Sequence, residues 1–359
     1  MKVHELLNVI DYIAPFRYGE VWDNNGLLVG DRNAEVKGIL TTLDCHPNVI
    51  QEAIDQNINV IISHHPIIFS KLSAVTEDGI GKIIRQLIKH DINLIALHTP
   101  LDHQPYGVSH MIAETLGFND TDVLIKHSET YQKLRVNVPK EDVERVKEGL
   151  SDAGVGNQGD YSECFFEYPV RGQFKPNEQA NPHTGTQNQL EVVEEYVVEA
   201  IFPAHLKKKV IATLYDVHPY EEPAFDVFTL EREIEVGLGV KINAETTLDA
   251  LVDTINQLEK PGVVNVVRGN DAPINSIGII GGSGMGYVND AFKSGIDVLI
   301  TGDVKYHEAY DAKLANRNII DAGHFLEVVM VDGLKQLLEE KLENINIQAS
   351  TVNTNPFTK

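Results

Sequence analysis

Two adjacent histidines follow an apolar run in this sequence, and this position suggests metal or substrate binding. His64 and His65 follow residues 58–62, which are rich in β-branched side chains and carry no charge, with only Ser63 between, and Pro66 comes next. The run predicts a buried strand, which ends at Pro66 because proline cannot donate the next ladder hydrogen bond. Ligand sites in open α/β sheets form at the carboxyl ends of strands. A histidine pair on a solvated turn is the alternative interpretation.

Other polar side chains follow other predicted strands. His98 and Asp102 come after the apolar residues 92–97, and His324 and Glu327 follow a predicted strand near the end of the chain. Residues at positions i and i+3 lie on one face of a helical turn, so His324 and Glu327 can hold one metal ion together. This mixture of nitrogen and oxygen ligands suits zinc, manganese or iron(II) better than copper(I).

The strongest candidates are too many for one structural zinc ion, which takes four ligands and usually includes thiolates. They suit two ions that share a bridging carboxylate or water, an arrangement that can polarise a substrate and generate hydroxide at neutral pH. Neighbouring side chains diverge, so His64 and His65 could each serve a different ion. Asp102, between histidine-bearing strand ends, is the predicted bridging carboxylate. The predicted ligands are His64, His65, Asp102, His324 and Glu327.

His98 is predicted to act outside this ligand set. It could orient a ligand, or it could move protons as a general acid or base, which makes it the candidate catalytic residue. A direct ligand role is the alternative. The remaining histidines near these motifs, His103, His110 and His307, are predicted to be surface or helix-capping residues.

Two further segments could line a substrate site. Trp22 and Asn24 lie in a predicted turn that holds the only tryptophan of the chain; an ordinary Asn-Gly turn with an aromatic packing anchor is the alternative. Gly282, Ser283 and Gly284 follow a predicted strand and open a predicted helix, so their backbone amides could cradle an anion such as phosphate. This motif is neither a Walker loop nor a dinucleotide fingerprint, and a tight strand–helix turn explains it equally well.

Both ends of the sequence alternate short apolar strands with amphipathic helices, which predicts an α/β fold with largely parallel sheets. A weak internal repeat matches residues 58–65 with 296–303, and residues 92–99 with 318–325. The repeat predicts two similar α/β halves. The predicted strands are residues 36–42, 58–62, 92–97, 276–280, 296–301 and 318–321. The predicted helices are residues 47–56, 81–90, 287–293 and 307–315.

The middle of the chain has a different pattern. Its predicted elements follow the β-α-β-β-α-β order of a ferredoxin-like unit, and residues 172–189 are polar and predict a long mobile loop. The predicted domains are a first core half at 1–129, an inserted α+β domain at 130–232, and a second core half at 233–359. The predicted elements of the insert are strands 131–138, 164–170, 190–202 and 224–230, and helices 141–153 and 205–215.

Composition narrows the function classes. The 359 residues include 53 acidic and 30 basic side chains, a net charge of −23, which would repel a nucleic-acid backbone. No apolar run approaches the length of a membrane span, and the amino-terminal residues do not resemble a signal peptide. With only two cysteines, a disulfide framework is excluded and a cytoplasmic location is expected.

Taken together, the motifs resemble the GTP cyclohydrolase 1 type 2 homologue family, also called Nif-three-like, over essentially the whole chain. The Ser-His-His-Pro and Gly-His-x-x-Glu motifs are the specific part of this resemblance. The motifs occur in the family's order: Trp22-Asp23-Asn24-x-Gly26, Ser63-His64-His65-Pro66, His98-Thr99-x-x-Asp102, Gly281-Gly282-Ser283-Gly284, Thr301-Gly302-Asp303 and His324-x-x-Glu327.

The resemblance implies two divalent metal ions per subunit, zinc most often, held by the five ligands named above. It also implies a PII/CutA-like inserted domain and a ring-shaped homohexamer. We therefore expect a metal-dependent hydrolase of a nucleotide or a related phosphorylated small molecule. The alternative is a metal- or metabolite-binding regulator or scaffold, with the insert as sensor and no catalysis.

Overall fold

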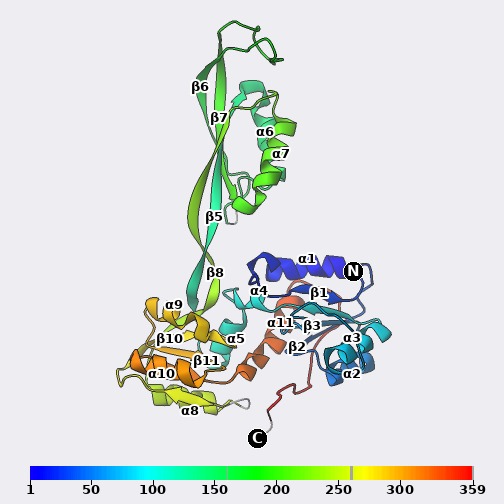
Figure 1. Ribbon diagram of the computed structural model, residues 1–359, viewed down its shortest axis with the longest axis vertical. Coiled ribbons are helices and arrows are strands. Elements are labelled where there is room, and N and C mark those ends of the chain that lie inside the picture. The colour runs from blue at the N-terminus through cyan, green and yellow to red at the C-terminus, as the bar shows by residue number, and fades with distance from the viewer. Residues whose placement is uncertain (160, 259–261, 358–359) are drawn as a thin grey trace. The chain divides into compact units, whose positions relative to one another are not determined.

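The computed structural model of the chain describes residues 1–159, 161–258 and 262–357 (Figure 1). The chain divides into two compact units. One contains Met1–His127 together with Glu235–Lys359, and the other is Ser128–Ile234. The strands β5 (Asp122–Pro139) and β8 (Phe225–Thr246) carry the chain from one unit to the other and back.

The first half of the larger unit is built on a five-stranded sheet with the order β1-β4-β3-β2-β13. The strands β13, β2, β3 and β4 run parallel, and β1 is antiparallel to β4. The last strand of the chain, β13, thus completes the sheet of the first half. The bounds are β1 (Gly26–Val29), β2 (Ile39–Thr42), β3 (Val60–Ser63), β4 (Asn93–Ala96) and β13 (Ile347–Ala349).

The second half has the strand order β8-β10-β11-β12-β9. Its central strands β10, β11 and β12 are parallel, and β8 and β9 flank them in antiparallel orientation. The predicted α/β fold with largely parallel sheets is confirmed. The strands of the repeat, β3 with β4 and β11 with β12, are neighbouring parallel pairs in their own sheets. The bounds are β9 (Asn265–Val267), β10 (Ile274–Ile279), β11 (Val298–Thr301) and β12 (Asn318–Asp321).

Apolar side chains cover both faces of each parallel sheet. In β3, Val60 and Ile62 join a central core cluster while Ile61 joins an outer one, and β11 divides Ile300 and Leu299 in the same way. This is the alternation expected of strands that are buried on both sides. The central cluster holds side chains from strands of both sheets and from the helices α1, α5, α8 and α11. The outer clusters lie under α2 and α3 in one half and under α9 and α10 in the other.

The helices of this unit begin and end close to the predicted positions where the sequence carries clear signals. The helix α2 begins at Pro47, a residue that is well suited to a first helical position, and His46 caps it by accepting a hydrogen bond from the Asn48 N–H. The bounds are α1 (Val3–Ile13), α2 (Pro47–Asp55), α3 (Gly79–Lys89), α4 (Thr99–Asp102), α5 (Val108–Thr115), α8 (Leu248–Asn256), α9 (Val288–Lys293), α10 (Tyr306–Leu314) and α11 (Met330–Glu339), with short 3₁₀ turns η1 (Phe16–Tyr18), η4 (Gly284–Tyr287) and η5 (His324–Val329).

The inserted unit has the element order β-α-β-β-α-β and the strand order β6-β7-β5-β8. Its helices α6 and α7 lie side by side on one face of the strands (Figure 1). They bury Val146, Val210 and Leu214 against Val136 and Phe202. The unit therefore has an apolar core of its own. The bounds are η2 (Lys140–Asp142), α6 (Val143–Asp152), β6 (Phe166–Phe174), β7 (Glu191–Pro203), η3 (Ala204–Leu206) and α7 (Lys207–Val217).

The strands of the insert are longer than the sequence pattern predicts. The strand β6 pairs with β7 as far as Phe174, so the predicted loop of residues 172–189 begins only at Lys175. The strands β5 and β8 also extend beyond the predicted 131–138 and 224–230. The strand β5 begins at Asp122, before the polar residues 126–130, and β8 continues through the alternating residues 236–244, which pair with β10 from Val240 onward.

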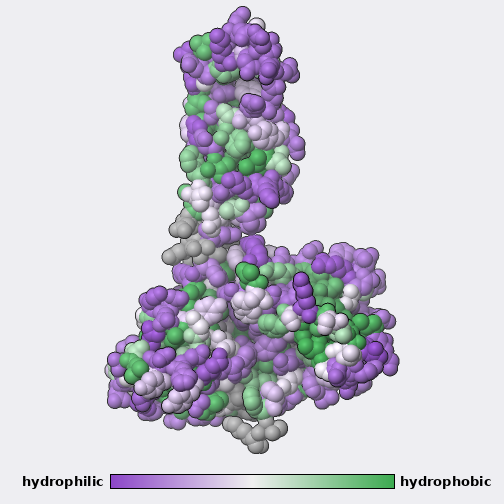
Figure 2. All heavy atoms as spheres, viewed as in Figure 1, coloured by the Kyte–Doolittle hydropathy of each residue, from purple (hydrophilic) through white to green (hydrophobic). Residues whose placement is uncertain are grey.

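Hydrophilic side chains cover most of the visible surface of both units, including the end of the insert that carries the β6–β7 loop (Figure 2). None of the described helices is long and apolar enough to cross a lipid bilayer.

Candidate metal centre

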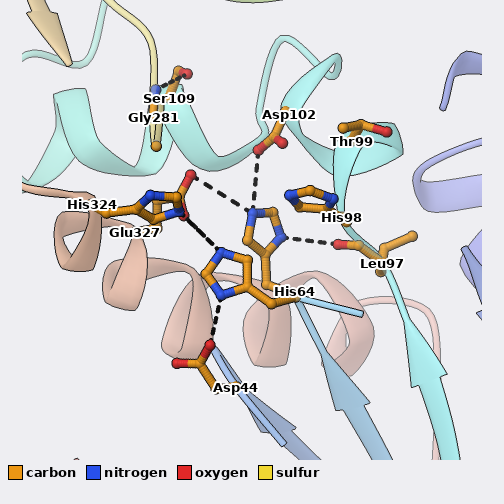
Figure 3. A network of polar contacts seen from close by, with 12 residues as sticks. Asp44, His64, Leu97, His98, Thr99, Asp102, Ser109, Gly281, His324 and Glu327 are labelled. Carbon is orange, nitrogen blue, oxygen red and sulfur yellow. Dashed lines mark hydrogen bonds and ion pairs between the residues drawn. The ribbon is translucent and has the colours of Figure 1, made fainter. Parts of the chain in front are cut away.

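Loops from both halves of the larger unit meet at the carboxyl ends of their parallel strands (Figure 3). In the first half, β2, β3 and β4 end level with one another, since Thr42 pairs with Ser63 and Ser63 with Ala96. The loops that follow carry Asp44, His64 with His65, and His98. In the second half, the loops after β11 and β12 carry Asp303 and His324. The Nε2 atoms of His65 and His324 lie 3.3 Å apart, so the two halves meet at this point.

His64 is fully buried within the cluster, with an exposed fraction of 0%. Its Nδ1–H donates to the Leu97 carbonyl at 3.0 Å, and its Nε2 lies 3.5 Å from Asp102 Oδ1. His64 Nε2 and Asp102 Oδ1 are both buried, and neither has a hydrogen-bond partner among the described residues. Because buried polar atoms are rarely left unpaired, a bound group between Nε2 and Oδ1 would resolve the deficit.

His65 and His324 have the same arrangement. The Nδ1 of His65 lies 2.7 Å from Asp44 Oδ1, and the Nδ1 of His324 lies 2.6 Å from Asp303 Oδ2. The Nε2 of each ring lies 3.1 Å from Oε2 of Glu327. Each ring is therefore fixed by a carboxylate on its outer side and presents Nε2 to the centre.

The outer partners decide how these rings are protonated. His64, His65, His98 and His324 all have Nδ1 next to a carbonyl or carboxylate oxygen, so Nδ1 carries the proton. The lone pair of each neutral ring is then on Nε2, which is the arrangement of metal-bound histidines whose second nitrogen is hydrogen-bonded.

The pKa values show how much the cluster favours positive charge. For His65, burial lowers the pKa, but the hydrogen bonds with Asp44 and Glu327 prevail and raise it to about 10. The hydrogen bond with Glu327 raises the pKa of His324 to about 9. Burial lowers the pKa of His64. Burial also raises the pKa of Asp102, and the nearby Glu327 raises it further. Protons thus hold the places where a divalent cation would be stabilised.

Among the described residues, three sets of side chains have their possible ligand atoms close enough together to hold a metal ion. Two of them share Glu327, which bridges His65 and His324 on one side and His64 and Asp102 on the other. The sequence interpretation made Asp102 the bridge, whereas Asp102 belongs to only one of these two sets. The third set joins His98 to His64 and His65. The donors are neutral imidazoles and carboxylates, and their chemistry fits zinc, manganese or iron(II).

His98 is held in place by the turn that contains Trp22. Its Nδ1 lies 2.9 Å from Asp23 Oδ1, and its backbone N–H donates to Asn25 Oδ1. Burial would raise the pKa of Asp23, but hydrogen bonds from His98 and Thr99 hold it well below its usual range. Asp23 therefore stays ionised and fixes the orientation of His98.

Trp22 is 56% exposed, so it is not a buried packing anchor. Its ring stacks on the exposed Phe69 at a centroid distance of 6.1 Å and meets the His98 ring edge-on at 6.0 Å. Asn24 ties the turn to the segment before Phe69 by donating from Nδ2 to the Ile68 carbonyl. The structure thus brings Trp22 to the centre, while Asn24 bonds to backbone in a supporting position.

The glycine-rich turn lies directly against Glu327. A Cβ on Gly282 would lie 2.6 Å from Glu327 Oε1, and the φ of Gly282 is +60°, so glycine is required at this position. The Gly284 N–H donates to Thr301 Oγ1, and the Gly281 N–H donates to Ser109 Oγ. The N–H groups of Gly281 and Gly284 thus already have acceptors within the protein. Anion binding by Gly282, Ser283 and Gly284 stays a prediction.

Sequence reasoning missed several residues of this cluster. Asp44 was not identified, although it follows a strand end as His64 does, and that position was the available signal. Asp303 was noted as part of the Thr301-Gly302-Asp303 motif but was given no role in the site. His103, predicted to be a surface or helix-capping residue, is buried and occupies the C-cap position of α4. Its Nδ1 lies 2.7 Å from His127 Nε2 and its Nε2 lies 3.3 Å from Glu20 Oε1, so polar partners compensate for its burial.

Comparisons with known proteins agree over nearly the whole chain. The family model of Duf34/NIF3 (NGG1p interacting factor 3) matches residues 1–356. A curated relative from Staphylococcus aureus (strain MSSA476), named GTP cyclohydrolase 1 type 2 homolog, is 43% identical over 364 residues, with 99% of each chain covered. A relative of the same name from Staphylococcus epidermidis is 42% identical over 364 residues, again with 99% of each chain covered.

Solved structures give the same result. The crystal structure of Staphylococcus aureus protein SA1388 matches with a TM-score of 0.86 and 40% identity, covering 100% of this chain and 99% of that one. The crystal structure of a Bacillus cereus protein related to NIF3 matches with a TM-score of 0.82 and 39% identity, with the same coverage.

Proposed function

The chain belongs to the Duf34/NIF3 family, and we propose that it is a dinuclear metal-dependent hydrolase of a nucleotide or a related phosphorylated small molecule. The observation that carries the proposal is the pair of ligand sets that share Glu327, together with the unpartnered, buried His64 Nε2 and Asp102 Oδ1. A mixed nitrogen and oxygen donor set of this size favours two ions, with zinc first and manganese or iron(II) as alternatives.

In this proposal each ion has its own ligands and Glu327 is common to both. His64 and Asp102 would hold one ion, and His65 and His324 would hold the other, with Glu327 available to both. When bound, divalent ions would polarise a substrate oxygen and lower the pKa of a coordinated water. Asp44 and Asp303 keep Nδ1 of their histidines protonated, so that Nε2 stays available as a ligand.

His98 is the group that would move a proton. Asp23 accepts from its Nδ1–H, so Nε2 carries the lone pair and can take a proton from water and return it to the leaving group. The exposed Trp22 and Phe69 rings lie next to His98 and offer aromatic faces on which a planar substrate such as a nucleobase could stack. The name of the relatives, GTP cyclohydrolase 1 type 2 homolog, points to the same substrate class. The homohexamer and the cytoplasmic location stay predictions from the sequence.

The test combines His64→Ala and His324→Ala in one variant and measures metal content and hydrolysis of a nucleotide panel. We expect both to fall together, because the variant removes one ligand from each ion. His307→Ala is the matched control, since His307 is exposed and belongs to none of the ligand sets. If the metal content of the variant falls while its hydrolysis rate stays unchanged, the proposal that this centre catalyses hydrolysis is wrong.

A further inference from the structure

A cavity of about 360 Å³ lies in the inserted unit, none of whose residues belong to the metal centre. Its walls come from β5, β7, the turn after α7 and the loop that follows β6. The volume is within the range of small-molecule binding sites. The lining residues include Asn137, Gly172, Glu195 and Tyr220.

Glu195 lines this cavity although it is only 5% exposed. Its carboxylate accepts a hydrogen bond from Asn137 Nδ2 at 3.5 Å and lies near the Tyr220 hydroxyl, and both partners are neutral. Within the described part of the chain, no lysine, arginine or histidine forms an ion pair with Glu195. Buried carboxylates are normally paired with a cation, so the structure leaves this charge to be balanced from the cavity.

A second acceptor lines the same cavity. Asn137 Oδ1 is buried and has no hydrogen-bond partner among the described residues. Gly172 leaves room beside the carboxylate, since a Cβ there would lie 3.0 Å from Glu195 Oε2. A carboxylate with no cationic partner beside an unpaired amide oxygen calls for a ligand that brings a positive charge and several donors, and an ammonium group brings three N–H donors.

The other walls suit a cation better than an anion. The rings of Tyr220 and His183 lie 5.9 Å apart, and Phe174 lines the same space, so aromatic faces are available to a positive charge. Two further carboxylates at the rim, Glu221 and Glu222, outweigh the exposed Lys175.

We propose that this cavity binds a small organic cation through a primary ammonium group, with Glu195 as its charge partner and Asn137 Oδ1 as a second acceptor. The metal centre plays no part in this binding, so the proposed hydrolase function and this site can fail independently.

The experiment is isothermal titration calorimetry on the full-length protein with three amines: ethanolamine, 1,4-diaminobutane and L-lysine. The neutral compound 1,4-butanediol has the size of 1,4-diaminobutane and serves as the uncharged match. We expect at least one amine to bind and the diol to produce no heat. Glu195→Gln keeps the shape of the side chain and removes its charge, and should weaken amine binding at least tenfold.

Glu194→Gln is the matched control, because Glu194 is the exposed neighbour on the same strand and should leave amine binding unchanged. Gly172→Ala is a second variant, which crowds the carboxylate without touching its charge and should also weaken binding. The proposal is overturned if no amine binds, if the diol binds as tightly as the diamine, or if Mg²⁺ binds there in place of the amines. Unchanged amine binding by folded Glu195→Gln would overturn it as well.

Discussion

At the scale of single residues, the metal centre depends on side chains one step away from the predicted ligands. Asp44 and Asp303 fix the tautomer of His65 and His324, and the Leu97 carbonyl does the same for His64. Since Nδ1 is occupied in each ring, Nε2 is left to face the centre. The orientation of His65 and His324 therefore depends on two acidic residues, Asp44 and Asp303, whose sequence context does not distinguish them from ordinary surface carboxylates.

Replacing Asp44 tests this dependence. Asp44→Ala should lower metal affinity roughly 10- to 100-fold, because His65 loses the partner that orients its ring. A competition titration against a chelator measures the affinity. Thr354→Val is the control, since it removes only the second hydrogen bond to Asp44. Equal affinities for Asp44→Ala and the unaltered protein would show that Asp44 does not orient the ligand.

Metal uptake should release protons near neutral pH. The pKa of His65 is about 10 and that of His324 about 9 without metal, so both rings carry a second proton at pH 7.5. These raised pKa values stabilise the metal-free fold fully below the unfolded value of about 6.5, and this stabilisation disappears as the pH rises through 9 to 10.

Calorimetry in buffers of different ionisation enthalpy counts these protons. We expect about two protons released per chain at pH 7.5, one from each ring, and a metal affinity that rises with pH up to about 10. An affinity that is independent of pH between 6.5 and 8.5 would contradict the assignment of His65 and His324 as ligands.

At the scale of elements, the strand ends were the part of the site that the sequence could predict. The apolar runs before His64 and His98 predicted β3 and β4, and the same rule placed His324 after β12. The role of Glu327 as the shared carboxylate could not be predicted, because it depends on how η5 meets the first half. The length of β5 was missed because its polar residues 126–130 lack apolar alternation. Residues 236–244 of β8 do alternate, so the sequence carried a strand signal there that the prediction did not use.

The glycine-rich turn gives a matched pair of variants. Gly282→Ala should displace Glu327 and destabilise the fold by roughly 1 kcal/mol or more, because the new Cβ meets Oε1 and the φ of +60° disfavours any side chain. Gly286→Ala is the control, since no described atom lies within 4 Å of its Cβ position. Thermal unfolding and metal content are measured for both, and equal losses in the two variants would contradict this role for Gly282.

At the scale of the whole molecule, the insert has its own apolar core and leaves the larger unit through two adjacent backbones. Near the point of exit, a Cβ on Gly237 would meet the Ile125 carbonyl, and the Gly237 N–H donates to the His103 carbonyl. The ends left by removing the insert are therefore close enough for a short turn.

Replacing residues 128–234 by Asn-Gly should leave a folded protein that still binds metal, because the central core and all predicted ligands lie in the larger unit. Circular dichroism and metal analysis check this outcome. A shortened chain that folds but holds no metal would show that the insert contributes to the centre.

The last strand of the chain, β13, pairs with β2 of the first half, and His324 and Glu327 also come from the final tenth of the sequence. During synthesis on the ribosome, His64 and His65 therefore leave the exit tunnel long before their partners are made. A nascent chain has only a fragment of the centre, and a prematurely terminated product never completes it. A chain that stops before His324 lacks His324, Glu327 and β13, so it cannot complete either of the two ligand sets that share Glu327.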